Sequence, residues 1–149
     1  MILDKKKILE FQKNRDPYLM IDHVDFVEPG KSAKGYKFLK KDEWFFKIHW
    51  PGDPNMPGAL QMESLSQMAS ISILTLPNNK GKLLYLTNIE NIKFIKKVLP
   101  EKKMYIETRI ISFKRGLAIC EGETTVDGEI ACKGKFKLIL PNEIIKYKI

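Results

Sequence analysis

Residues 58–76 read GALQMESLSQMASISILTL, and this stretch decides the fold. Apolar residues cover almost the whole circumference of the helix that it predicts, so the helix is expected to be buried rather than to lie on the surface. The run approaches the ~20 residues that a membrane span requires. Gln61, Glu63 and Gln67 make spanning costly, and we expect no membrane insertion. Because the neighbouring segments are strand-like, we predict an α+β fold in which an antiparallel sheet wraps around one long buried central helix.

The segments around this helix are predicted to be strands, because they alternate apolar and polar residues or end at turn signals. Before the helix they cover residues 18–28, KSAKGYKFL (31–39) and EWFFKIHW (43–50). After residue 80 they cover residues 82–94, 103–113, 117–126 and 129–140. The last joint, Asp127-Gly128, suits a type I′ hairpin turn. Residues 2–12 predict a short amphipathic helix, which Asp16-Pro17 ends.

The composition is that of a single lysine-rich domain. A chain of 149 residues with 44% hydrophobic residues can form one sizeable core, and we expect residues 1–149 to form one domain. The net charge of +8 is the balance of 26 basic and 18 acidic residues. The basic residues are 23 lysines and only 3 arginines, scattered without the spacing of a DNA-binding motif. Proteins that recognise nucleic-acid bases favour arginine, whose guanidinium group can donate two parallel hydrogen bonds, so nucleic-acid binding is not expected. The lysines either form an ordinary solvated surface or attract an acidic partner at long range.

The chain start and the cysteines predict a cytoplasmic setting. Residues 1–7 lead straight into a lysine run and lack the apolar stretch of a secretory signal. Cys120 and Cys132 are too few for a disulfide framework or a metal cluster. Both lie in strand-like segments, where cysteine acts as a small buried hydrophobe.

Residues 49–67, HWPGDPNMPGALQMESLSQ, carry the candidate chemistry. Three prolines stiffen the approach to the helix. Gly58 lies at the helix start, where free N–H groups can polarise a carbonyl oxygen. Glu63 lies among apolar residues, with Gln67 one turn later, and burial would raise its pKa so that it acts as an acid. A lone His49 is more often structural, but base, amide donor and acid together suit proton abstraction beside a thioester carbonyl.

This stretch resembles the signature of the (3R)-hydroxyacyl-acyl carrier protein dehydratases of bacterial fatty acid synthesis. The residues in matching positions are His49, Trp50, Pro51, Gly52, Pro54, Met56, Pro57, Gly58, Glu63 and Gln67. Further similarity covers nearly the whole chain, at Arg15, Pro17, Tyr18, Leu19, Ile21, Asp22, residues 29–31, residues 94–98, residues 115–116 and residues 125–128.

The resemblance implies a hot-dog fold and a homodimer, often assembled further into a trimer of dimers, with active sites at the interface. His49 of one chain would take a proton from C2 of a 3-hydroxyacyl thioester. Glu63 of the other chain would help the C3 hydroxyl leave, and the Gly58 N–H would hold the thioester carbonyl. No metal or cofactor is implied, because the acyl carrier protein- or CoA-linked substrate brings its own phosphopantetheine arm.

The chain departs from the family at Ile48, where glycine usually precedes the histidine. If residues 48 and 49 lie on a strand, their side chains point to opposite faces, and Ile48 packs behind His49. Asp16, Val98 and Glu101 differ as well.

Two alternatives to the dehydratase are a hot-dog acyl thioesterase, which lacks this His-to-Glu spacing, and a non-catalytic acyl-thioester-binding protein, which Ile48 favours. The cluster Lys93, Lys96 and Lys97 is either a docking surface for an acidic carrier or an ordinary solvated strand edge.

Overall fold

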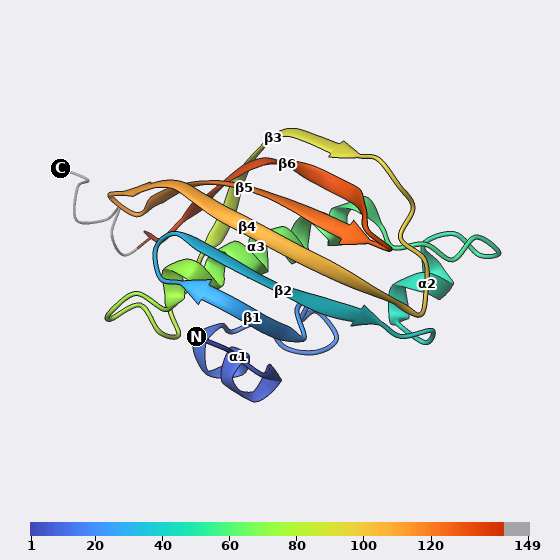
Figure 1. Cartoon of the computed structure of the whole chain (residues 1–149), viewed down its shortest axis with the longest axis horizontal. Helices are drawn as coiled ribbons and strands as arrows, with labels where there is room; N and C mark the ends of the chain where they lie inside the picture. The colour runs from blue at the N-terminus through green and yellow to red at the C-terminus, as the bar shows by residue number, and fades with distance from the viewer. Residues whose placement is uncertain (142–149) are drawn as a thin grey trace.

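An antiparallel six-stranded sheet curves around one long helix in the computed structural model, which describes residues 1–141 (Figure 1). The strands follow the order β1-β2-β4-β5-β6-β3 in the sheet. This is the hot-dog arrangement, as predicted. The predicted domain over residues 1–149 includes residues 142–149, which lie outside the described part. The elements are α1 (Lys5–Phe11), β1 (His23–Glu28), β2 (Ser32–Leu39), α2 (Trp44–Ile48), α3 (Gly58–Leu74), β3 (Tyr85–Phe94), β4 (Lys102–Lys114), β5 (Leu117–Val126) and β6 (Glu129–Ile139).

The central helix α3 is buried along nearly its whole length, as its sequence predicts. Of its 17 residues, only Gly58, Ala59 and Glu63 are not fully buried. Its buried polar side chains find partners inside the fold: Ser64 donates to the Leu60 carbonyl, and Gln61 accepts from Thr124. These bonds offset the loss of water around the polar groups. Among the described residues, no helix combines the length and apolar character that a membrane span needs.

The strand predicted over residues 43–50 is wrong, because the structure forms the short helix α2 there. Phe45 and Phe46 are both buried, whereas Trp44 and Ile48 are exposed. Adjacent strand residues point to opposite faces, so a strand at the sheet surface could not bury two successive phenylalanines against one core. A helical turn can bury both. The first predicted strand is also shorter, since β1 begins only at His23.

The strands after α3 agree with the prediction to within three residues at each end. Asp127 and Gly128 have φ values of 52° and 77°, which fit the type I′ turn. Strand β3 pairs only with β6 and forms one edge of the sheet. It exposes large apolar side chains: Tyr85, Ile89 and Phe94. An unpaired edge of this kind is a template for pairing with another strand.

Candidate active site

Glu63 lies in the first half of α3, among residues that are otherwise buried. Burial raises the pKa of its carboxyl group, as the apolar surroundings in the sequence predict, while a hydrogen bond from Gln67 partly opposes this shift in the pKa. The Gln67 Nε2 lies 2.8 Å from Glu63 Oε1. A carboxyl group with a raised pKa can hold a proton nearer neutral pH and give it to a leaving group.

The partner of Glu63, Gln67, is itself fixed by the loop that precedes β1. Its Nε2 donates to the Tyr18 carbonyl at 2.9 Å, and its Oε1 accepts from the Met20 amide at 2.7 Å. Gln12 Nε2 also donates to Gln67 Oε1, at 3.3 Å. The sequence places Gln67 one turn from Glu63, but the anchoring by residues 18–20 requires contacts across 47 or more positions, which no local pattern reveals.

His49 follows α2 directly and caps its carboxyl end, with its amide donating to the Phe45 carbonyl. Its Nδ1 lies 2.9 Å from the Asn55 carbonyl oxygen. A carbonyl oxygen can only accept, so Nδ1 carries the proton and Nε2 of the neutral ring is left as the acceptor. The Trp50 ring stacks on the imidazole, with centroids 5.0 Å apart. The arrangement leaves Nε2 able to take a proton.

Gly58 is the first residue of α3, where the helix offers no internal acceptor for its N–H. A Cβ at this position would lie 2.9–3.1 Å from the Phe94 ring, closer than side chains normally approach. Only glycine therefore fits beneath Phe94 without displacing the ring. The helix start could offer its N–H to a carbonyl oxygen, which is the role that the resemblance implies.

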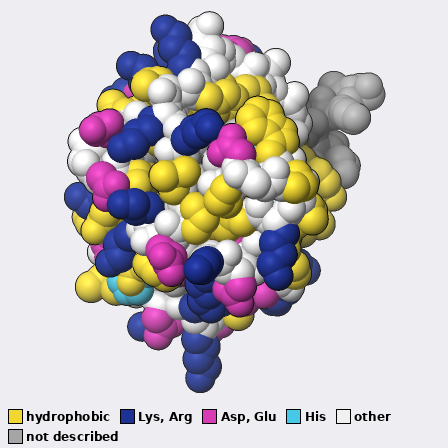
Figure 2. Space-filling view, turned by 90° about the vertical axis from the view of Figure 1, so that its right-hand side faces the viewer, with side chains coloured by type: hydrophobic (Ala, Val, Ile, Leu, Met, Phe, Trp, Pro, Cys, Tyr) yellow, Lys and Arg dark blue, Asp and Glu magenta, His cyan; other side chains and the backbone are white. Residues whose placement is uncertain are grey.

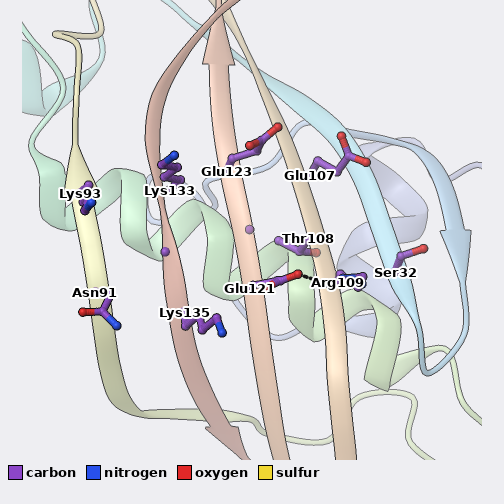
Figure 3. A pocket seen from close by; sticks show the side chains of 12 residues that line it. Ser32, Asn91, Lys93, Glu107, Thr108, Arg109, Glu121, Glu123, Lys133 and Lys135 are labelled. Atoms are coloured by element: carbon purple, nitrogen blue, oxygen red, sulfur yellow. Dashed lines mark hydrogen bonds and ion pairs between the residues drawn. The ribbon is translucent and has the colours of Figure 1, made fainter.

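Within one chain, among residues 1–141, no hydrogen bond or ion pair joins His49 to Glu63. A broad hollow of about 810 Å³ lies elsewhere, on the outer face of the sheet with α3 behind the strands (Figure 3). Neither His49, Glu63 nor Gly58 lines it. Its charged lining residues are Lys93, Glu107, Arg109, Glu121, Glu123, Lys133 and Lys135.

The packing predicted for Ile48 does not occur within the chain. Ile48 is the last residue of α2, not of a strand, and 68% of its surface is exposed. It therefore does not lie behind His49, because the geometry that would put the two side chains on opposite faces is absent.

The predicted lysine cluster is partly neutralised. Lys97 Nζ lies 2.9 Å from Asp53, and Lys96 Nζ lies 3.3 Å from Glu129. Lys93, the third member of the cluster, lines the outer hollow.

Comparisons with known proteins agree with this fold and sequence signature. The model of a family described as a FabA-like domain matches residues 13–135. The chain is 41% identical to the 3-hydroxyacyl-[acyl-carrier-protein] dehydratase FabZ of Clostridium novyi, over 88% of this chain and 92% of the relative. It is 38% identical to the protein of the same name from Bacillus subtilis, over 89% of this chain and 94% of the relative.

Solved structures share the fold at lower identity. The dehydratase heterocomplex ApeI:P from Xenorhabdus doucetiae gives a TM-score of 0.78 at 14% identity, covering 93% of this chain and 95% of that chain. A hypothetical thioesterase with coenzyme A from Streptococcus pneumoniae gives a TM-score of 0.58 at 14% identity, covering 78% and 83%. At such identities these two structures show the fold alone. The family model and the FabZ relatives, which span most of the sequence, show that the chain belongs to the FabA-like family.

Proposed function

We propose that this chain is a 3-hydroxyacyl-[acyl-carrier-protein] dehydratase that removes water from a 3-hydroxyacyl thioester to give the trans-2-enoyl thioester. The observation that carries the proposal is that a histidine and a partly buried glutamate, His49 and Glu63, stand at the two positions that match the dehydratase signature. The Asn55 carbonyl accepts from His49 Nδ1 and so leaves Nε2 as the ring nitrogen that can accept a proton, and burial raises the pKa of Glu63. A base and an acid with these properties are what β-elimination of water requires.

In the proposed reaction His49 Nε2 takes the proton from C2 of the substrate. The C3–O bond breaks, and Glu63 gives its proton to the departing hydroxyl, which leaves as water. The Gly58 N–H donates to the thioester oxygen, where negative charge develops as the C2 proton departs. Proton exchange with solvent then returns His49 to the neutral form and Glu63 to the protonated form.

We propose that the site forms between two copies of this chain. His49 and Glu63 share no interaction within one chain, and the exposed edge strand β3 offers unpaired backbone groups and apolar side chains to a second copy. Figure 2 shows one face on which apolar side chains gather among lysines and carboxylates. We expect a homodimer that buries this apolar surface, and a trimer of such dimers.

We place the enzyme in the cytoplasm, where acyl carrier protein or CoA thioesters would be its substrates. Both cysteines are free and buried. Burial raises the pKa of Cys120 to about 12 and of Cys132 to about 11, so neither forms the reactive thiolate at neutral pH.

The test follows the reaction in reverse with crotonyl thioester. A dehydratase hydrates the double bond, so absorbance in the enoyl-thioester band falls and no free thiol appears. Release of thiol would instead identify an acyl thioesterase. Binding without any change in absorbance or thiol would identify a non-catalytic acyl-thioester-binding protein, and either result would contradict the proposal.

A further inference from the structure

A lysine occupies the core-facing register of β2. Burial alternates along this strand, and its inward positions are Ala33, Gly35, Lys37 and Leu39. Only 5% of the Lys37 side chain is exposed. Moving an ammonium group out of water is costly, and such a lysine persists only where carboxylates compensate for the lost hydration. Packing alone would favour an apolar residue at this position.

Two carboxylates flank the Lys37 ammonium group, and they belong to different segments. Asp22 Oδ1 lies 3.9 Å from Lys37 Nζ, and Glu43 Oε1 lies 3.5 Å from it. These separations describe ion pairs rather than hydrogen bonds. The other Asp22 oxygen accepts from the Phe38 amide at 2.8 Å, which fixes that carboxylate. Glu43 precedes α2 but makes no capping hydrogen bond to it, so its carboxylate is directed to the lysine.

One branch from Lys37 leads to Glu63. Asp22 ends the loop of residues 12–22 between α1 and β1, and this loop holds Gln67 through the Tyr18 carbonyl and the Met20 amide. Gln67 in turn donates to Glu63 Oε1. Fixing the end of this loop therefore fixes the side chain that orients the Glu63 carboxyl group.

The other branch leads to His49. Glu43 lies at the start of α2, and His49 caps the other end of that five-residue helix through its amide bond to Phe45. Trp44 Nε1 also donates to the Pro17 carbonyl at 3.1 Å, which joins α2 to the loop of the first branch. Because α2 has only five residues, we expect a shift at its start to displace its end.

We propose that Lys37 is a positioning residue that fixes the orientations of His49 and Glu63 together, through Glu43 and Asp22. This inference rests on the proposed function for the roles of His49 and Glu63. Lys37 touches neither of them. If each active site takes His49 from one chain and Glu63 from the other, one Lys37 serves two active sites of the dimer.

The experiment combines amide hydrogen exchange with kinetics on the variant Lys37→Met, which keeps the unbranched shape and removes the charge. We expect the Met20 and His49 amides to exchange about tenfold faster, because their acceptors become loosely held. The Ile110 amide, which donates to the Lys31 carbonyl at the other end of β2, should keep its rate. The kcat should fall about tenfold with little change in KM, since misplaced groups slow chemistry more than binding.

Two further variants separate the branches, and a third is the matched control. Because the Trp44–Pro17 hydrogen bond links the two branches, Asp22→Asn should speed exchange of the Met20 amide more than that of the His49 amide, and Glu43→Gln should do the reverse. Lys34→Met removes an exposed lysine from the same strand and should change neither amide nor kcat. If Lys37→Met does not fold, the amide exchange rates of Asp22→Asn and Glu43→Gln test the proposal in its place.

Equal acceleration of the Met20, His49 and Ile110 amides would show that Lys37 only stabilises the fold, and would overturn the inference. The inference would also be overturned if the Met20 and His49 amide exchange rates, or the kcat, of Lys37→Met equalled those of Lys34→Met. A wild-type chain that dehydrates nothing, yet shows the branched exchange pattern, would reject the proposed function and retain the coupling by Lys37.

Discussion

The two halves of the candidate site are built in opposite ways. Glu63 lies on a helix that the sheet encloses, and its partner Gln67 is held by hydrogen bonds from the loop before β1. His49 follows a helix of five residues, between Ile48 and Trp50, which are 68% and 56% exposed. One chain thus surrounds the proposed acid with buried residues, whereas the proposed base is only partly buried between two exposed side chains, where we expect a second chain to complete its surroundings.

The largest effect should come from removing either group, despite their different burial. His49→Ala and Glu63→Ala should each lower the dehydration rate by about 10²–10⁴-fold, the usual contribution of a general acid or base. Circular dichroism should show an intact fold for both variants. Rates within a few-fold of the wild-type rate in a folded variant would remove that residue from the mechanism.

Mixing the two inactive variants tests whether the halves belong to different chains. In a shared site, each heterodimer has one doubly damaged site and one intact site. Complete random exchange should therefore restore roughly a quarter of wild-type activity. Heterodimers demonstrated by mass spectrometry but still inactive would mean that His49 and Glu63 act within one chain.

The exposed half should also be the half that meets the carrier. Lys97 pairs with Asp53 in the segment that follows His49, and Lys96 lies nearby in sequence. Charge reversal at Lys96 and Lys97 should raise KM for a carrier-linked substrate about fivefold and weaken its salt dependence. Lys80→Glu is the matched control, since Lys80 also pairs with a surface carboxylate, Glu10. If wild type, the Lys96 and Lys97 variant and Lys80→Glu all have the same KM, the lysine cluster serves only solubility.

The buried half should show a pH-dependent loss of stability. Because burial raises the pKa of Glu63 above its ordinary value of 4.5, the folded state binds its proton more tightly than the unfolded state does. The stability that this proton contributes is complete below about pH 4.5 and is lost as the pH rises through the folded-state pKa. Glu63→Gln should therefore gain free energy of unfolding relative to wild type as the pH rises through this range. Urea denaturation from pH 4 to 8 measures the difference, and a constant gap between the two proteins would contradict it.

The smallest effect should be that of Ile48→Gly. Since Ile48 is exposed in the chain, the substitution loses little apolar burial, and the main cost is the poor helix propensity of glycine at the end of α2. We expect a decrease of about 1 kcal/mol or less in the free energy of unfolding. A larger loss that depends on protein concentration would show that a second chain buries this side chain. Activity that appears only in Ile48→Gly would identify the wild-type chain as an inactive relative.

The sequence was informative where a long segment has a consistent apolar pattern or where turn residues mark the ends of strands. The all-round apolar pattern of residues 58–76 predicted the buried helix, and strong turn signals located the strands of the second half. It failed at residues 43–50, because a short run of aromatic residues suits a strand and a helix equally until the core on which Phe45 and Phe46 pack is known.

The sequence by itself determined the chemical groups of the candidate site: a histidine, a glycine at a helix start and a glutamate in apolar surroundings at fixed spacing. Only the tertiary structure decided how they are held. The Asn55 carbonyl decides which ring nitrogen of His49 carries the hydrogen, and the orientation of Glu63 depends, through Gln67, on a loop almost 50 residues earlier. Residue identity sets which reactions are possible, whereas pKa and orientation depend on neighbours that only folding brings within a few ångströms.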